Sequence, residues 1–149
     1  MIHKAAETDI AAIADMAVQL WKESAIEELA EEFAEIIHSD ECAVFISSEE
    51  NTPVGFAQVQ LRHDYVEGTD SSPVGYLEGI FVKREYRKCG YAKELLKHCE
   101  EWAIKKGCTE FASDCELTNY TSLAFHLNVG FTEANRLICF TKKLVNSID

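Results

Sequence analysis

Tyr76–Val82, which reads YLEGIFV, and Arg87–Ala92, which reads RKCGYA, form the stretch of sequence that decides the fold. The first segment is an apolar run with strand character, and a helical pattern opens at Tyr91. The turn between them would leave backbone N–H groups unpaired at the positive end of a helix dipole, where phosphate binds well. Gly90 would let phosphate oxygens approach the backbone, and the basic side chains before it add positive charge. The pattern predicts a pyrophosphate-binding turn, with an ordinary helix N-terminus as the alternative.

The remaining chain alternates between patterns typical of helices and of strands. Helices are predicted over residues 10–20, 26–37, about 90–106 and 119–128, where apolar residues recur at helical spacing. Further strands are predicted over 2–4, 42–46, 54–61 and 111–113, and a closing β region begins at Gly130–Phe131 and runs through Cys139–Phe140. The order β-α-α-β-β-β-α-β-α-β-β predicts a mixed α/β fold with a crossover, in one domain over residues 1–149.

Length and composition exclude several classes of protein. The chain has 149 residues, 47% of them apolar, which suits one domain with a substantial core. No apolar run approaches the roughly 20 residues that span a bilayer, and the first residues do not resemble an export signal, so a cytoplasmic location is expected. The six cysteines show no C-x-x-C pair, which favours reduced thiols and gives no metal site.

The formal charge of −12 bears on the kind of partner. Nucleic acid is disfavoured, because phosphate binding needs clustered Lys and Arg. A cationic substrate is favoured through the summed field of the acidic side chains. An acidic surface that only keeps the protein soluble is the alternative.

Two acidic residues are candidates for binding and activating such a cation. Glu78 interrupts an apolar strand, where a buried carboxylate is costly unless it is paired or used in function. It is expected to act as a base near a substrate amine, directly or through water, unless it faces solvent or is satisfied by a neighbouring Arg. Asp114 follows the predicted strand 111–113, where open α/β sheets place ligands, although a helix N-cap or turn role is as plausible.

The residues around the first stretch resemble motif A of the GNAT family of acetyl-CoA-dependent N-acetyltransferases. Within that family the chain is most similar to the aminoglycoside 6'-N-acetyltransferases, and the similarity covers nearly its whole length. The segments that carry it are Gln19–Trp21, Arg62–Val66, Asp70–Val74, Leu77–Val82, Ala112–Asp114 and Gly130–Phe131.

The resemblance implies a fold, a cosubstrate and a set of site residues. The fold would be a central, mostly antiparallel sheet that splays open between flanking helices, and the cosubstrate would be acetyl-CoA. Trp21 and Tyr65 would line the aminoglycoside pocket, and Glu78 and Asp114 would bind its ammonium groups. The coenzyme A contacts would come from Ile80, Phe81, Val82, Arg87, Lys88, Cys89, Gly90, Tyr91, Ala92 and Asn119. The resemblance also implies a homodimer built partly through the C-terminal strands.

His126 is the candidate general acid, and it departs from the family pattern. Asn119, Ser122 and His126 lie along one face of the predicted helix. In many GNAT enzymes the position of His126 is a Tyr that is proposed to protonate the departing thiolate. A histidine can donate a proton near neutral pH, and a coenzyme contact or a partly buried helix histidine is the alternative.

The expected reaction is direct transfer of an acetyl group to the 6'-amine of an aminoglycoside in a ternary complex, giving antibiotic resistance. A backbone N–H near Phe81 or Val82 would polarise the thioester carbonyl, and no cysteine would act as a nucleophile. Two alternatives remain at the level of sequence. The acceptor could be a polyamine or another small amine, or the chain could be a coenzyme A-binding module without catalysis.

Overall fold

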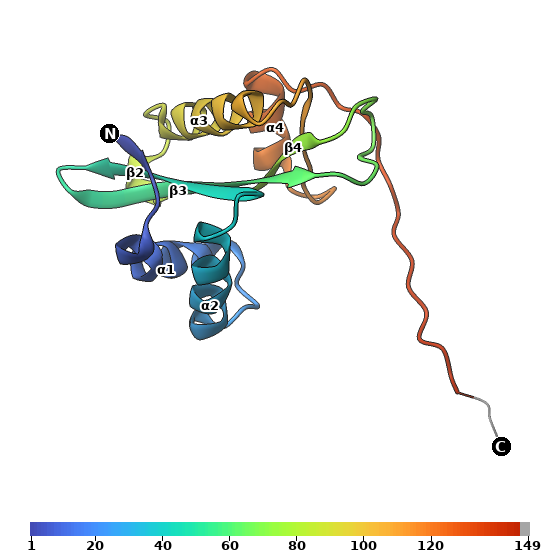
Figure 1. The fold of residues 1–149 in the computed structure, drawn as a ribbon, viewed down its shortest axis with the longest axis horizontal. Helices are drawn as coiled ribbons and strands as arrows, with labels where there is room; N and C mark the ends of the chain where they lie inside the picture. The colour runs from blue at the N-terminus through green and yellow to red at the C-terminus, as the bar shows by residue number, and fades with distance from the viewer. Residues whose placement is uncertain (147–149) are drawn as a thin grey trace.

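A five-stranded sheet forms the centre of the computed structural model, which describes residues 1–146 (Figure 1). The strands lie side by side in chain order, from β1 to β5. Neighbours from β1 to β4 pair antiparallel, whereas β5 pairs parallel to β4. The strands are β1 (Ile2–Lys4), β2 (Cys42–Glu49), β3 (Thr52–Arg62), β4 (Val74–Val82) and β5 (Phe111–Ser113). The predicted mixed, mostly antiparallel sheet is confirmed.

Helices cover both faces of the sheet and close two apolar cores. The longer helices are α1 (Ile10–Leu20), α2 (Ile26–Ile37), α3 (Tyr91–Lys105) and α4 (Tyr120–Asn128), and two 3₁₀ turns are η1 (Glu7–Asp9) and η2 (Arg84–Tyr86). Helix α3 packs Leu95, Leu96 and Trp102 against one face. Helices α1 and α2 cover the other face (Figure 1), where Ile13 and Phe33 are fully buried. Strand β2 contributes side chains to both cores, because successive side chains of a strand point to opposite faces.

Strand β4 contains a bulge at Glu78. Successive residues of β3 pair with Gly79 and then with Leu77, so Glu78 has no partner in the ladder. In a regular strand, residues four apart would face the same side. Here Leu77 packs in the core under α3, whereas Phe81 packs in the core under α1 and α2. The bulge therefore turns the strand over between these two residues.

The short strand β5 stops pairing with β4 just before the bulge at Glu78. Its ladder joins Phe111–Ser113 to Gly75–Leu77, and the pairing stops one residue before Glu78. Beyond the bulge, the edge of β4 that would face β5 has no strand beside it in the described part of the chain. The sheet is thus open at the C-terminal half of β4, as the resemblance implied.

Most of the elements predicted from sequence are present. Helix α2 and strand β5 have the predicted bounds, and α1, α3 and α4 differ from prediction by one residue at most at either end. The strands of the β2–β3 hairpin extend a few residues beyond the predicted segments, because pairing continues through the turn-proximal residues. Asn119 caps α4, since its side chain accepts a hydrogen bond from the backbone N–H of Ser122 at 3.1 Å.

The predicted closing β region is wrong for the described chain. Residues 131–146 contain no helix or strand, and the segment runs away from the sheet (Figure 1). The segment is apolar, as a strand would require, but backbone groups form a strand only against a partner, and no strand within residues 1–146 pairs with it. We call residues 132–146, which are exposed throughout, the C-terminal arm.

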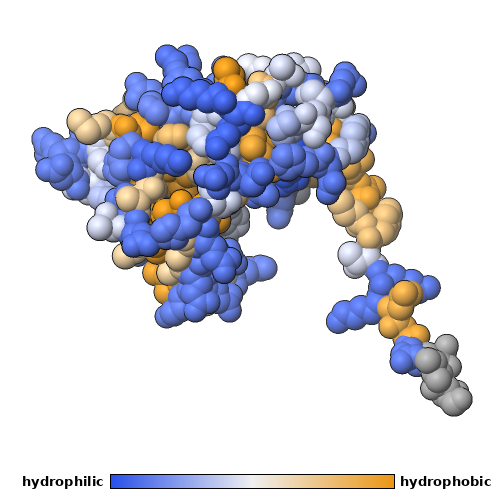
Figure 2. Space-filling model, in the orientation of Figure 1, coloured by the Kyte–Doolittle hydropathy of each residue, from blue (hydrophilic) through white to orange (hydrophobic). Residues whose placement is uncertain are grey.

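The C-terminal arm presents large apolar side chains to solvent. They are between 66% and 89% exposed and comprise Leu137, Ile138, Phe140, Leu144 and Val145. Figure 2 shows this apolar surface along the arm, while the visible face of the body is largely hydrophilic. The base of the arm is tied to the loop after β3, where the Asn135 amide donates a hydrogen bond to Glu67 at 2.8 Å.

Within residues 1–146, no helix has both the length and the apolar composition needed to cross a membrane.

Replacing Leu95 with Ala tests the packing of α3 on the sheet. Leu95 is fully buried at 0% exposure, so Leu95→Ala should lower the free energy of unfolding. The expected loss is about 2–5 kcal/mol. The matched control is Ile104→Ala on the same helix, where the side chain is 68% exposed; it should change stability by less than about 0.5 kcal/mol. Urea unfolding at a fixed protein concentration measures both, and equal losses would contradict the packing described.

Candidate active site

Two cavities with opposite charge lie along the C-terminal half of β4. The first has a volume of about 520 Å³ and is lined mainly by basic side chains. The second has a volume of about 170 Å³ and includes both acidic candidates, Glu78 and Asp114. Strand β4 contributes Phe81 to the first and Leu77–Ile80 to the second. We call them the basic cavity and the acidic cavity.

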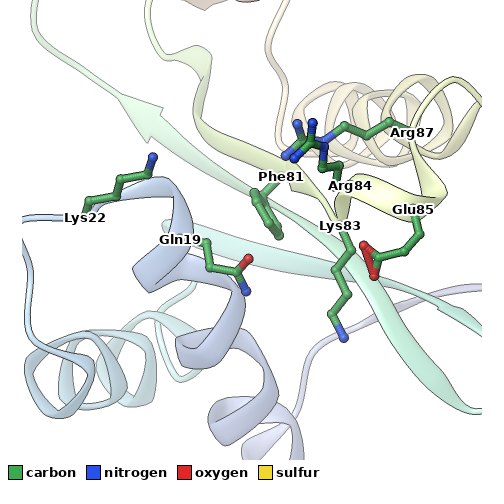
Figure 3. Close-up of a pocket in the computed structure, with 7 residues that line it drawn as sticks. All are labelled: Gln19, Lys22, Phe81, Lys83, Arg84, Glu85 and Arg87. Carbon is green, nitrogen blue, oxygen red and sulfur yellow. The ribbon is translucent and has the colours of Figure 1, made fainter.

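The basic cavity gathers four cationic side chains and one acid. Figure 3 shows Gln19 on α1 and Lys22, two residues beyond the end of that helix, on the side of the cavity opposite the residues that follow β4. Lys83, Arg84, Glu85 and Arg87 follow β4, and Phe81 lies near its end. Four of the chain's 14 Lys and Arg residues thus line one cavity of a protein whose net charge is −12. Such a concentration of positive charge suits an anionic ligand.

The turn from Arg87 to Ala92 joins this cavity to the start of α3. Gly90 is the N-cap of α3 and has φ of 89°, and Lys88 also has a positive φ, of 64°. A Cβ on Gly90 would meet nothing within 4 Å, so it is the left-handed backbone that favours glycine there, and the space beside it is open. The Arg87 side chain donates a hydrogen bond from Nε to the carbonyl of Val82 at 2.8 Å, which anchors the turn to β4.

Tyr91 fixes the opposite end of this turn. Its hydroxyl donates a hydrogen bond to Glu49 at the end of β2, with a distance of 2.7 Å. That hydrogen bond raises the pKa of Tyr91 to about 12, so the hydroxyl stays protonated. Val82, Lys88, Cys89, Gly90, Tyr91 and Ala92 do not line either cavity. They form the end of β4 and the turn beside the basic cavity.

The acidic cavity unites residues from α1, β4, β5 and α4. Trp21, Glu78, Asp114, Asn119 and His126, all predicted from sequence, line it together with Ile80. The Trp21 indole lies directly on the backbone of Gly79, where an added Cβ would come within 2.6 Å of the ring. A glycine next to the bulge therefore makes room for Trp21.

Glu78 forms a two-point ion pair with Arg62 at the end of β3. Nε and Nη2 of Arg62 donate to the two carboxylate oxygens at 3.1 Å and 2.9 Å. The Glu78 side chain is 20% exposed and that of Arg62 is 40% exposed, so the pair is only partly screened by water. The alternative in which Glu78 is satisfied by a neighbouring Arg is therefore present in the structure.

Asp114 is held by a tyrosine instead of a cation. The hydroxyl of Tyr76 donates a hydrogen bond to Oδ2 of Asp114. Burial and this hydrogen bond raise the pKa of Tyr76, so its hydroxyl remains a donor. The Arg62 guanidinium stacks on the Tyr76 ring, with its carbon 3.4 Å from the ring centroid. A continuous chain of contacts thus links Glu78, Arg62, Tyr76 and Asp114.

His126 contacts a serine on β5. Its Nδ1 lies 2.7 Å from the backbone carbonyl oxygen of Ser122, and its Nε2 lies 2.8 Å from Oγ of Ser113. Because a carbonyl oxygen only accepts, Nδ1 carries a proton. Nε2 is hydrogen-bonded to the Ser113 hydroxyl, which also donates a long hydrogen bond of 3.4 Å to the carbonyl of Leu77. The ring of Phe131 packs beside the imidazole, with the ring centres 5.0 Å apart.

One predicted site residue lies apart from this group. Tyr65, in the loop after β3, is 77% exposed and lines neither cavity. Its hydroxyl accepts a weak hydrogen bond from the backbone N–H of Gly68 at 3.4 Å, within the same loop.

Sequence reasoning missed three residues of the acidic cavity's surroundings: Arg62, Tyr76 and Ser113. Ser113 directly precedes Asp114, so its position was visible as the end of a strand. Tyr76 lies in an apolar run, and its hydroxyl, which needs a hydrogen-bond partner when buried, is the signal that could identify it. Arg62 lies 16 residues from Glu78, and only the antiparallel pairing of β3 with β4 brings the two together.

No three His, Cys, Asp or Glu side chains within residues 1–146 are grouped closely enough to hold a metal ion.

Comparisons with known proteins show the family of the chain. Residues 10–131 match the acetyltransferase (GNAT) family. A curated aminoglycoside N(6')-acetyltransferase type 1 from Salmonella typhimurium strain LT2 is 44% identical over 109 residues, which is 73% of this chain and 75% of the relative. A protein of the same name from Stenotrophomonas maltophilia is 38% identical over 144 residues, covering 96% of this chain and 93% of the relative.

Solved structures show the same fold. AAC(6')-Iy in complex with the bisubstrate analogue CoA-S-monomethyl-acetylneamine superposes with a TM-score of 0.93 at 37% identity, covering 97% of this chain and 98% of that chain. The aminoglycoside 6'-N-acetyltransferase AAC(6')-Ih from Acinetobacter baumannii superposes with a TM-score of 0.90 at 33% identity, covering 97% and 99% of the two chains. The resemblance stated from sequence is confirmed, and the chain belongs to the acetyltransferase (GNAT) family.

Proposed function

We propose that this chain is an acetyl-CoA-dependent aminoglycoside 6'-N-acetyltransferase that confers resistance, folded as one domain over residues 1–149. The observation that carries the proposal is the pair of oppositely charged cavities on the open half of β4. One suits an anionic cosubstrate and the other a cationic acceptor. The names of the relatives supply the two ligand classes, since they are aminoglycoside 6'-N-acetyltransferases and one is bound to a coenzyme A analogue.

Coenzyme A is assigned to the open edge of β4 and the turn that follows. The pantetheine arm would pair along Ile80–Val82, where β4 pairs with β3 on one side and has no strand at its other edge within residues 1–146. The pyrophosphate would lie against the backbone N–H groups from Arg87 to Ala92, at the N-terminus of α3. The four cations of the basic cavity and the open space at Gly90 fit a group that carries several phosphate charges. Asn119, at the cap of α4, would contact the arm from the other side.

The acceptor is assigned to the acidic cavity. Glu78 and Asp114 would attract its ammonium groups, and Trp21 would pack against a sugar ring. A free alkylamine has a pKa of about 10, so it must lose a proton before it attacks, and Glu78 would receive that proton directly or through water. Tyr65 stays a proposed contact of the aminoglycoside, from an exposed position on the loop after β3 outside the cavity.

Acetyl-CoA, when bound, supplies an acetyl group activated as a thioester, and direct transfer forms a C–N bond as the C–S bond breaks. His126 is assigned as the proton donor for the leaving sulfur. The protonated imidazole would donate from Nε2 to Ser113 Oγ, whose own proton would move toward the sulfur. The 2.8 Å contact between these atoms supports this route. Donation from Nδ1 to the Ser122 carbonyl holds the ring in the required orientation.

The chain is proposed to act as a homodimer in the cytoplasm. The exposed apolar side chains of the C-terminal arm support an interface with a second copy, because a monomer gains nothing from presenting them to water. The six cysteines form no disulfide in the structure, which fits a reducing compartment.

An acceptor screen tests the proposed activity. Free-thiol release from acetyl-CoA should be fast with kanamycin or tobramycin, which carry a 6'-amine. It should be absent with a matched aminoglycoside that carries a 6'-hydroxyl. Turnover with spermidine alone would show that the acceptor is an amine other than an aminoglycoside. Coenzyme A binding without turnover of any acceptor would favour a binding module.

Substitution of Ser113 and His126 tests the proton route. Ser113→Ala and His126→Ala should each lower kcat by about 10- to 100-fold, at the low end for general acid catalysis because a thiolate is a good leaving group. The KM for acetyl-CoA should change little. The double variant should be no slower than the slower single variant, because both residues act in one path. His38→Gln, which changes an exposed histidine paired with Glu7, is the control; additive losses would rule out a shared path.

Charging the C-terminal arm tests the dimer. The double substitution Ile138→Asp and Phe140→Asp should convert the protein to a monomer in sedimentation equilibrium, because it places carboxylates in an apolar interface. Ile104→Asp, on an exposed apolar residue of α3, should leave the dimer intact. A wild-type protein that sediments as a monomer at micromolar concentration would overturn the proposal.

A further inference from the structure

We infer that Arg62 is a positioning residue for acetyl transfer: it holds the Glu78 carboxylate at the edge of the acidic cavity and braces the Tyr76–Asp114 pair beside it. This inference rests on the proposed function and adds to it a residue that does not itself line the cavity.

The geometry of the ion pair fixes the carboxylate. A planar guanidinium that donates two hydrogen bonds to the two oxygens of one carboxylate allows little rotation about the last side-chain bond. Both oxygens of Glu78 are engaged in this way, at 3.1 Å and 2.9 Å. Each oxygen keeps a further lone pair, so the carboxylate remains able to accept from an ammonium group that enters the cavity.

The bulge explains why Glu78 needs such a partner. Glu78 is the residue without a partner in the β3–β4 ladder, so its backbone is less restrained than that of its neighbours. Arg62 lies opposite Val74 in the ladder and reaches past Tyr76 to Glu78. The Arg62 side chain thus reaches along β4 as far as the bulge at Glu78.

The same guanidinium braces the second acid. Its carbon lies 3.4 Å from the centre of the Tyr76 ring, and the hydroxyl of that ring donates to Asp114. Movement of Arg62 would release the tyrosine ring and, with it, the orientation of Asp114. Arg62 therefore orients both acids of the acidic cavity, Glu78 directly and Asp114 through Tyr76.

The charge balance around Glu78 predicts which kinetic constant changes. The ionisable groups that face it or share its cavity are Arg62, Tyr76, Asp114, Cys115, His126 and, from β2, Cys42. Arg62 is the one group in this set that is positively charged at every working pH, and its pairing with Glu78 raises its pKa further against the effect of burial. Its removal leaves the cavity more negative, so cation binding would not weaken, whereas the placement of Glu78 would be lost.

Arg62→Met, which keeps much of the side-chain volume and removes the donors, tests the inference. The expected result is a fall in kcat of roughly 10- to 100-fold, the size of effect that follows a small misplacement of a reacting group. The KM of the aminoglycoside should stay the same or decrease, and the KM of acetyl-CoA should not change. Arg62→Lys, which keeps the charge and loses the two-point geometry, should recover part of the loss.

A double-mutant cycle separates this role from simple stabilisation. In a Glu78→Gln background, Arg62→Met should lower kcat by a smaller factor than it does in the wild-type background, because part of its effect acts through the Glu78 carboxylate. Arg136→Met is the matched control, since Arg136 pairs with Glu133 in a similar two-point fashion outside both cavities. Thermal melting of each variant shows whether it is folded.

The possible outcomes separate the inference from the proposed function. Wild-type protein without turnover of any 6'-amino aminoglycoside would overturn the proposed function itself. Active wild-type protein with kcat of Arg62→Met within twofold of it would overturn only the role of Arg62. The same holds for a kcat loss that is undiminished in the Glu78→Gln background, or for a rise in aminoglycoside KM as the main effect.

Discussion

The bulge at Glu78 is the constraint on which the rest of the site depends. It shifts the side-chain alternation of β4, so that Leu77 packs under α3 while Phe81 packs under α1 and α2. Strand β5 stops pairing one residue earlier, which leaves the second half of β4 with an open edge. Both cavities lie on that half. A regular, fully paired strand would offer neither the edge nor the reoriented carboxylate.

The charged side chains are also divided between the two cavities along β4. A net charge of −12 describes a field that attracts cations, yet four basic side chains surround the larger cavity. Local clustering outweighs the net charge at contact distance, because salt screens charges that lie more than about 10 Å away. In the acidic cavity, one of the two acids is neutralised by Arg62 and the other is only hydrogen-bonded by Tyr76. The two carboxylates are therefore not equivalent.

The sequence was sufficient for elements whose signal is local and insufficient for pairings between distant segments. Helix α2 and strand β5 follow from periodicity and turn residues, and Trp21, Glu78, Asp114 and His126 do line one cavity as expected. The ion pair of Glu78 with Arg62 depends on a register that contains a bulge, which no residue pattern announces. The apolar run near Phe140 predicts a strand, but a strand also needs a partner, and none pairs with this run within residues 1–146.

The adjacency of Trp21 and Lys22 has a consequence for how the two cavities communicate. The indole lies on Gly79 in the acidic cavity, and the ammonium group of the next residue lines the basic cavity. A ligand that restrains Lys22 also restrains the backbone from which Trp21 projects. Thermodynamic linkage makes such an effect reciprocal, so an anion in one cavity and a cation in the other change each other's affinity by the same factor.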